Sequence, residues 1–185
     1  TTNQQDSFAF VPTVGIPEGT EIYFTDNGWR CDEGLNTGEG ILKWRANECI
    51  APGTVIIWKK RADPYDSGSL PVVSTGTMTV ITGDFAINRK HEQILAYQNP
   101  SGDPPTFLYC LNSAAPAPGD WDTCPLPSSD KSYYTALPPG LQNGLTAVSV
   151  ENYDDVVLST NETALSIEGD RVTVLQYVSD FNNWI

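Results

Sequence analysis

The sequence predicts an all-β domain, either a β-sandwich or a jelly roll. About ten short segments rich in β-branched and aromatic residues follow one another along the 185 residues, separated by turn signals. The 15 glycines and 14 prolines supply many of those turns. Long amphipathic helical patterns are rare. Many short strands at turn-punctuated spacing are typical of sandwiches and jelly rolls.

The clearest strand signal lies at residues 21–25, where side chains of opposite character alternate. Ile22 and Phe24 would face one side of this strand, and the residues between them the other. Asp26-Asn27-Gly28 follows and predicts a turn, because Asn tolerates and Gly prefers a positive φ. An acidic, glycine-rich loop then leads to a second strand at residues 41–44.

The same features predict the other strands. They span residues 6–14, 54–59, 77–81, 91–98, 107–111, 146–150 and 155–158. Phe8 and Phe10 would share one face of the first strand, and Pro12 would bend its far end.

The C-terminal segment 171–178 fits two structures. Its β-branched residues favour a strand. However, Val174, Leu175 and Val178 also fit one face of a helix, and Gly169-Asp170 would supply the N-cap.

Composition excludes several classes of function. The 10 Lys and Arg residues against 23 Asp and Glu residues give a net charge of -13, which disfavours nucleic-acid binding. No apolar run approaches the ~20 residues of a membrane span. Catalysis by a Ser-His-Asp arrangement would depend on the single histidine, His91, which lies in an ordinary turn-to-strand stretch. We therefore expect a non-enzymatic protein.

Four cysteines without paired CxxC spacing favour disulfides over zinc. Three connectivities are possible, and pairs that close short loops would be Cys31–Cys49 and Cys110–Cys124. The alternative is four free buried cysteines. Disulfides predict an extracellular, secreted protein.

Calcium is the metal that the acidic loop would suit. Calcium takes oxygen ligands from carboxylates, amides and carbonyls, often on glycine-rich loops. The candidate ligands are Asp26, Asn27, Asp32, Glu33 and Glu39. No EF-hand spacing is present, so these residues could equally be turn formers and solvated acids.

Two other kinds of site are candidates. Among the five tryptophans, Trp29 and Trp121 stand beside acidic turns and would be the exposed pair able to stack on sugars, although most tryptophans in small β domains belong to the core. Asn161-Glu162-Thr163 is a sequon, which predicts an N-linked glycan on Asn161 in a secreted chain.

The chain resembles a known family over nearly its whole length. The segments DSFAFV, IPEGTEIYFTDNGW, GEGILKW, APGTVI, EQILAYQ, ALPPGLQNGLTAV and FNNW are similar to secreted β-rich domains of bacteria and unicellular eukaryotes, mostly without assigned function. The resemblance implies a jelly-roll-like antiparallel β-sandwich, a short C-terminal helix and no established catalytic residues. Extracellular glycosylated fibrils are built from such domains.

Three departures from that family stand out. The family usually has an Asp where His91-Glu92 stand, and the four cysteines are not part of its pattern. It also usually begins with one more strand, ahead of DSFAFV.

These observations predict a single secreted domain over residues 1–185, with a polar tail at 1–5, that polymerises. A sheet lacking its first strand would leave unpaired N–H and C=O groups for another subunit. We expect a structural subunit of a glycosylated filament or surface assembly, whose partner is itself. The alternative is a calcium-dependent, lectin-like carbohydrate-binding module, which a glycan array would distinguish.

Overall fold

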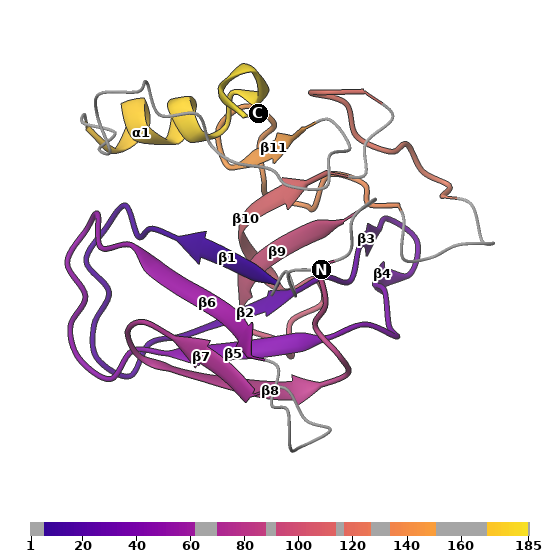
Figure 1. The fold of residues 1–185 in the computed structure, drawn as a ribbon. Coiled ribbons are helices and arrows are strands. Elements are labelled where there is room, and N and C mark those ends of the chain that lie inside the picture. Colours follow the sequence, from indigo (N-terminus) through magenta and orange to yellow (C-terminus); the bar gives the residue numbers. More distant parts are fainter. Residues whose placement is uncertain are drawn as a thin grey trace, which may run out of the picture.

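The computed structural model describes residues 6–61, 70–87, 92–113, 117–126, 134–150 and 170–184. Strands dominate the regular structure of these residues, and helix is confined to the C-terminal segment (Figure 1). The strands are β1 (Ser7–Phe10), β2 (Glu21–Thr25), β3 (Trp29–Arg30), β4 (Gly34–Leu35), β5 (Ile41–Arg45), β6 (Ile56–Arg61), β7 (Leu70–Val73), β8 (Thr77–Thr82), β9 (Gln93–Gln98), β10 (Thr106–Asn112) and β11 (Ala147–Ser149). The helical elements are α1 (Arg171–Val178) and the 3₁₀ helix η1 (Phe181–Asn183).

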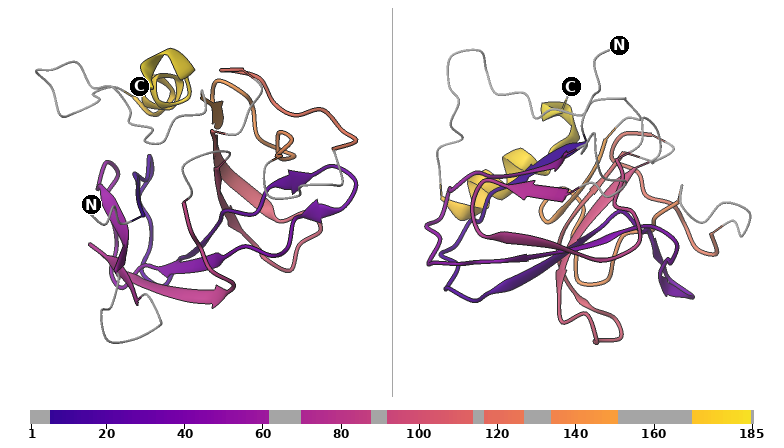
Figure 2. Two further views of the ribbon diagram at one scale, coloured as in Figure 1. Left: turned by 45° about the vertical axis from the view of Figure 1, so that its right-hand side comes forward. Right: turned by 60° about the horizontal axis from the view of Figure 1, so that its bottom comes forward.

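Two sheets pack face to face and form a sandwich. The larger has six strands in the order β11-β10-β9-β2-β5-β8, and the smaller has three in the order β1-β6-β7. In Figure 2 the smaller sheet lies over one part of the larger one, whose β2, β5, β8 and β9 contribute to the core between the two sheets. All neighbouring strands are antiparallel except β10 and β11, which run parallel. The predicted all-β sandwich with a short C-terminal helix is confirmed.

The first core fills the space between the two sheets. Phe8 and Phe10 of β1 lie against Phe24 of β2, with ring centroids 5.0 and 4.9 Å apart. Trp44 and Trp58 are among the most deeply buried side chains of this core. The alternation predicted for residues 21–25 thus places its apolar face inside the sandwich.

A second core lies on the opposite face of the larger sheet. Leu95 and Tyr97 of β9 point into it, whereas the intervening Ile94 and Ala96 pack against the first core. A strand buried on both faces needs a continuous apolar run, which explains the apolar middle of β9. The two-stranded sheet β3-β4, which contributes Trp29 and Leu35, covers this second core together with irregular segments.

Most of the predicted strands are present, with changed ends. β2 has the predicted bounds, and β1 stops at Phe10, ahead of Pro12. The predicted strand 155–158 lies outside the described residues. The predicted turn at Asp26-Asn27-Gly28 is wrong: Asp26 and Asn27 are 1% and 3% exposed, and the turn comes later, at residues 31–33.

The C-terminal segment 171–178 is a helix. Asp170 caps it by accepting a hydrogen bond from the Thr173 backbone N–H at 2.9 Å. The helix end docks on β10, where the Tyr109 hydroxyl donates to the Val178 carbonyl at 3.0 Å. No helix in the described part of the chain is both long and apolar enough to cross a membrane.

Candidate functional site

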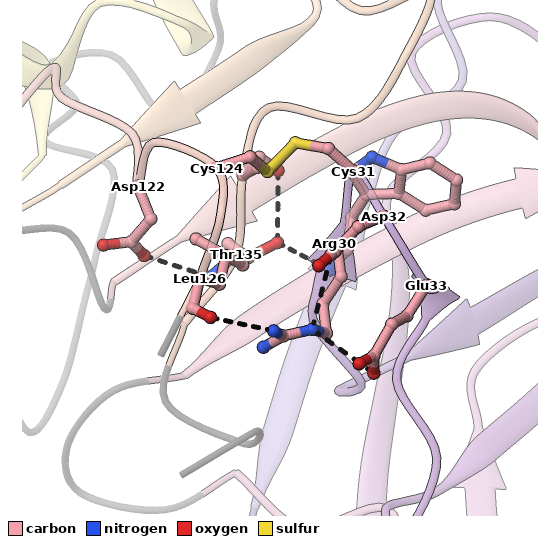
Figure 3. Close-up of a disulfide and its surroundings, with 10 residues drawn as sticks. Arg30, Cys31, Asp32, Glu33, Asp122, Cys124, Leu126 and Thr135 are labelled. Atoms are coloured by element: carbon pink, nitrogen blue, oxygen red, sulfur yellow. Dashed lines mark hydrogen bonds and ion pairs between the residues drawn. A yellow bond between two sulfur atoms is a disulfide. The ribbon is translucent and has the colours of Figure 1, made fainter. Parts of the chain in front are cut away.

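One disulfide staples two distant loops together. Cys31, directly after β3, bonds to Cys124, 93 residues later, with their Cα atoms 6.2 Å apart. The predicted pairs Cys31–Cys49 and Cys110–Cys124 are both wrong: Cys49 and Cys110 are free. Proximity in the sequence gave the wrong partners because the 117–126 segment packs on the second core. There Cys124 lies beside Cys31 (Figure 3).

The two free cysteines differ in their surroundings. Cys49 is exposed in the bend that follows β5. Cys110 is fully buried in the second core, and this burial raises the pKa of its thiol. A buried neutral thiol is a poor nucleophile, so reactivity belongs to Cys49.

A buried arginine lies beneath the disulfide (Figure 3). The Arg30 side chain is 2% exposed, and its Nη2 donates to the Leu126 carbonyl at 3.0 Å. Its Nε lies 3.8 Å from an oxygen of Asp32 and 3.5 Å from one of Glu33. A buried guanidinium requires such counter-charges, so these two acids have a structural partner that the sequence pattern did not reveal.

Backbone and side-chain bonds fasten a third segment to the same place. The Trp29 N–H donates to the Thr135 hydroxyl at 2.8 Å, and the Thr135 N–H donates to Asp122 at 3.0 Å. The Ala136 N–H donates to the Trp29 carbonyl at 2.9 Å. Together with the disulfide, these contacts hold residues 117–126 and 134–136 as a lid on the second core.

One buried carboxyl group, that of Asp26, and one partly buried group, that of Glu39, lie where β2 gives way to the loop toward β5. Asp26 accepts hydrogen bonds from the backbone N–H groups of Gly40 at 2.7 Å and Ala86 at 2.9 Å. Burial raises the pKa of Asp26 to about 6, although these hydrogen bonds oppose the rise. Gly40 is required here, because a side chain at this position would collide with the backbone of Phe85.

Glu39 is the more strongly perturbed of the two groups. Its Oε2 is buried and accepts no hydrogen bond from the described residues. Burial, together with the negative charges of Asp26 and Glu92, raises the pKa of Glu39 to about 8. Glu39 therefore keeps its proton at neutral pH.

The five predicted calcium ligands do not converge on one point. Asp26, Asn27 and Glu39 are linked: the Glu39 N–H donates to Asn27 Oδ1 at 3.2 Å, and Asp26 acts on the Glu39 carboxyl by charge. Asp32 and Glu33 lie instead on Arg30. Among the described residues, no group of three or more His, Cys, Asp or Glu side chains is arranged to hold a metal ion. Calcium binding stays a prediction.

The tryptophan pair predicted to be exposed is wrong in one member. Trp29 is 8% exposed and packs in the second core against Phe107, with ring centroids 5.2 Å apart. Trp121 is half-buried beside the same core, and its indole N–H donates to Asn143 at 2.9 Å. The two rings therefore do not form an open sugar-stacking platform. Asn161 and His91 lie outside the described residues.

Three of the four outer strands of the two sheets carry a feature that disfavours pairing. In β7, backbone groups point alternately toward β6 and away from it. The Ser74 N–H donates to the Ile57 carbonyl of β6, so the nitrogen of Pro71, three residues earlier, points away from β6. Proline has no N–H to offer on that free side. β8 contains a bulge opposite Ile41 and Leu42. The Gly119 N–H covers the Ser149 carbonyl of β11 at 2.9 Å.

The outer edge of β1 is different. The Lys60 N–H donates to the Asp6 carbonyl at 2.8 Å, and β1 continues in regular antiparallel register with β6. Backbone groups of successive residues point alternately toward β6 and away from it, so the N–H and C=O groups of Ser7 and Ala9 point away from β6. Within the described residues, these groups have no hydrogen-bond partner, and both side chains are exposed. We call Ser7–Phe10 with this open side the β1 edge.

Comparison of the chain with protein-family models, with curated proteins and with solved structures finds no match. The candidate sites are therefore interpreted from their own geometry.

Proposed function

We propose that this protein is a structural subunit of an extracellular glycosylated filament or surface assembly, and that it polymerises by strand addition at the β1 edge. The observation that carries the proposal is the contrast among the outer strands. β7, β8 and β11 carry a proline, a bulge and a covering hydrogen bond, whereas β1 is regular and its outer side has no pairing strand among the described residues. Natural sheets block their edges when pairing is unwanted.

The side chains around the β1 edge suit an incoming strand. Ser7 and Ala9 are small and uncharged, so they neither repel nor obstruct a neighbouring backbone. Asp6, at the start of the strand, lies 3.8 Å from the Lys60 ammonium group, which it shares with Asp84 at 2.8 Å. A strand beside β1 would gain main-chain hydrogen bonds, which supply affinity in strand addition.

The outer face of the smaller sheet would extend the contact. Ile57, which pairs with Ala9, is 40% exposed, and Val72 on β7 is 46% exposed. Isolated apolar residues are normal on a surface, but here they line one face beside the open edge. A subunit that offers one surface and accepts at another makes a heterologous contact, which propagates as a helix unless it closes.

An extracellular location is supported by the disulfide, because oxidising compartments allow such bonds to persist. The net charge of -13 opposes close packing of subunits. Bound calcium would neutralise part of this negative charge, and glycans would keep the charged surfaces of neighbouring subunits apart. Both are therefore part of the proposal.

A proline substitution tests the β1 edge. In Ala9→Pro the N–H on the free side is lost, whereas the hydrogen bonds of β1 to β6 come from Phe8 and Phe10 and remain. We expect the native chain to form oligomers or filaments, detected by light scattering and electron microscopy, and Ala9→Pro to remain monomeric.

Ala9→Thr is the matched control, because it keeps the N–H and suits a strand. Circular dichroism and melting temperature establish that both variants fold. A native chain that stays monomeric at high concentration, with and without calcium, would refute the proposed function. Assembly of Ala9→Pro equal to that of Ala9→Thr would refute the β1 edge as its site.

A further inference from the structure

The disulfide leaves a second glycosylation signal intact. Asn47-Glu48-Cys49 has the asparagine of a sequon, a non-proline middle residue and a cysteine in place of Ser or Thr. A thiol can stand in for the hydroxyl at this position, because it also carries a hydrogen that can be donated, although more weakly. Cys49 retains this hydrogen because Cys31 bonds to Cys124 instead. We propose that Asn47 is an acceptor of N-linked glycans when the chain passes through a secretory pathway.

The place of Asn47 in the fold suits a bulky substituent. Asn47, Glu48 and Cys49 are all exposed, and they form a bend between the buried residues Ala46 and Ile50. Both flanks are fixed by backbone hydrogen bonds: the Ala46 N–H donates to Thr20 at 3.0 Å, and the Ile50 N–H donates to Ile16 at 2.8 Å. The bend is thus a rigidly held surface loop, which can carry a sugar without disturbing the core.

Among the described residues, the side-chain partner of Asn47 is Thr77, and this contact tolerates the modification. The Asn47 Nδ2 donates to the Thr77 hydroxyl at 2.9 Å, and the same hydroxyl donates to Asn47 Oδ1 at 3.0 Å. The amide nitrogen carries two hydrogens, and glycosylation replaces one. The other hydrogen and the carbonyl oxygen remain available to Thr77, which is itself exposed.

The transfer step needs a lipid-pyrophosphate-linked oligosaccharide and the transferase of the pathway. The Asn47 Nδ2 attacks the anomeric carbon of the first sugar, and a nitrogen–carbon bond forms. The bond from that carbon to the pyrophosphate oxygen breaks, and the lipid pyrophosphate leaves with its electron pair. The nitrogen loses one proton to a base of the transferase. The thiol of Cys49 takes part only through its hydrogen and must be neither oxidised nor alkylated.

The experiment uses the full chain secreted from a eukaryotic host, with Asn161→Gln to remove the Asn-x-Thr sequon. Peptide N-glycosidase in heavy-oxygen water converts any glycosylated Asn47 to labelled aspartate. Trypsin then releases residues 46–59, between Arg45 and Lys59, for mass spectrometry. We expect partial labelling of Asn47, total loss of labelling in Cys49→Ala, and a several-fold gain in Cys49→Thr.

The two cysteine variants make each outcome decisive. Cys49 is exposed and unbonded, so both variants should fold, and equal melting temperatures verify this. If Asn47 is labelled only in Cys49→Thr, the asparagine is accessible but the thiol of Cys49 does not support glycosylation. That result would overturn the inference. Absence of label in all three chains would overturn it as well. Neither outcome depends on whether the chain polymerises.

Discussion

Replacing Glu39 by Gln should stabilise the protein in a strongly pH-dependent way. Burial and two neighbouring carboxylates raise the pKa of Glu39 from 4.5 to about 8. The folded chain therefore holds this proton more tightly than the unfolded chain. Between the two pKa values, the unfolded chain is ionised while the folded chain is not, so the free energy of unfolding falls as pH rises. Glutamine does not titrate and escapes this loss.

The size of the effect follows from the pKa shift. Each unit corresponds to about 1.4 kcal/mol, so the shift sets an upper limit of about 5 kcal/mol above pH 8. Glu39 is partly exposed, and solvent screening reduces the expected gain to about 1–3 kcal/mol. Well below pH 4.5, where the carboxyl group is protonated in both states, the gain should approach zero.

Urea unfolding followed by tryptophan fluorescence measures this gain, from about pH 5 to about pH 9 and in EDTA to exclude calcium. Asp26, with its pKa raised to about 6, has the same sign and is present in both chains, so only its charge coupling to Glu39 enters the difference. Glu18→Gln, at an exposed glutamate, is the matched control and should show no such trend. A Glu39→Gln gain that stays constant with pH, or that shrinks as pH rises, would refute the reasoning.

Three further measurements follow from the cysteines and the acidic loop. Changing both Cys31 and Cys124 to Ser removes a crosslink between positions 93 residues apart, and should lower the free energy of unfolding by about 3–5 kcal/mol in urea titrations; a loss below about 1 kcal/mol would contradict the stapling role. A maleimide should label Cys49 in the native chain and Cys110 only after denaturation, so equal rates would be inconsistent with the structure. Millimolar calcium should stabilise the chain by about 2 kcal/mol relative to EDTA, and unchanged melting curves would remove calcium from the proposed function.

Patterns local to one element were readable from the sequence. The alternation at residues 21–25 gives β2 its bounds and its buried face, because a strand's side-chain period depends only on neighbours along the chain. Segment 171–178 was ambiguous because its residues fit both periods. It is a helix whose first turn is capped by Asp170 and whose last turn is bonded to Tyr109. The cap can be recognised from neighbouring residues in the sequence, whereas the contact with Tyr109 cannot.

Contacts between distant segments were not readable. The pairing of Cys31 depends on the 117–126 segment packing on the second core, and loop length gave the wrong partner. Asp32 was a plausible calcium ligand until Arg30 was seen to be buried beside it. Trp29 follows polar residues in the sequence, yet it packs under the lid formed by residues 117–126 and 134–136. In each case long-range packing determines the burial of a polar or aromatic side chain.

The salt dependence of assembly separates the proposed backbone contact from an ionic one. Each subunit carries a net charge of -13, so bringing two copies together is opposed by Coulomb repulsion. The groups that Ser7 and Ala9 offer at the β1 edge are uncharged N–H and C=O groups, and the nearby carboxylate of Asp6 shares Lys60 with Asp84. Salt shortens the screening length from about 30 Å at 0.01 M to about 10 Å at 0.1 M, which weakens repulsion and leaves a hydrogen-bonded ladder nearly unchanged. Sodium chloride should therefore promote assembly over this range, as judged by light scattering at constant protein concentration. Assemblies that dissociate as the sodium chloride concentration rises would instead indicate subunits joined by ion pairs. That result would count against strand addition at β1.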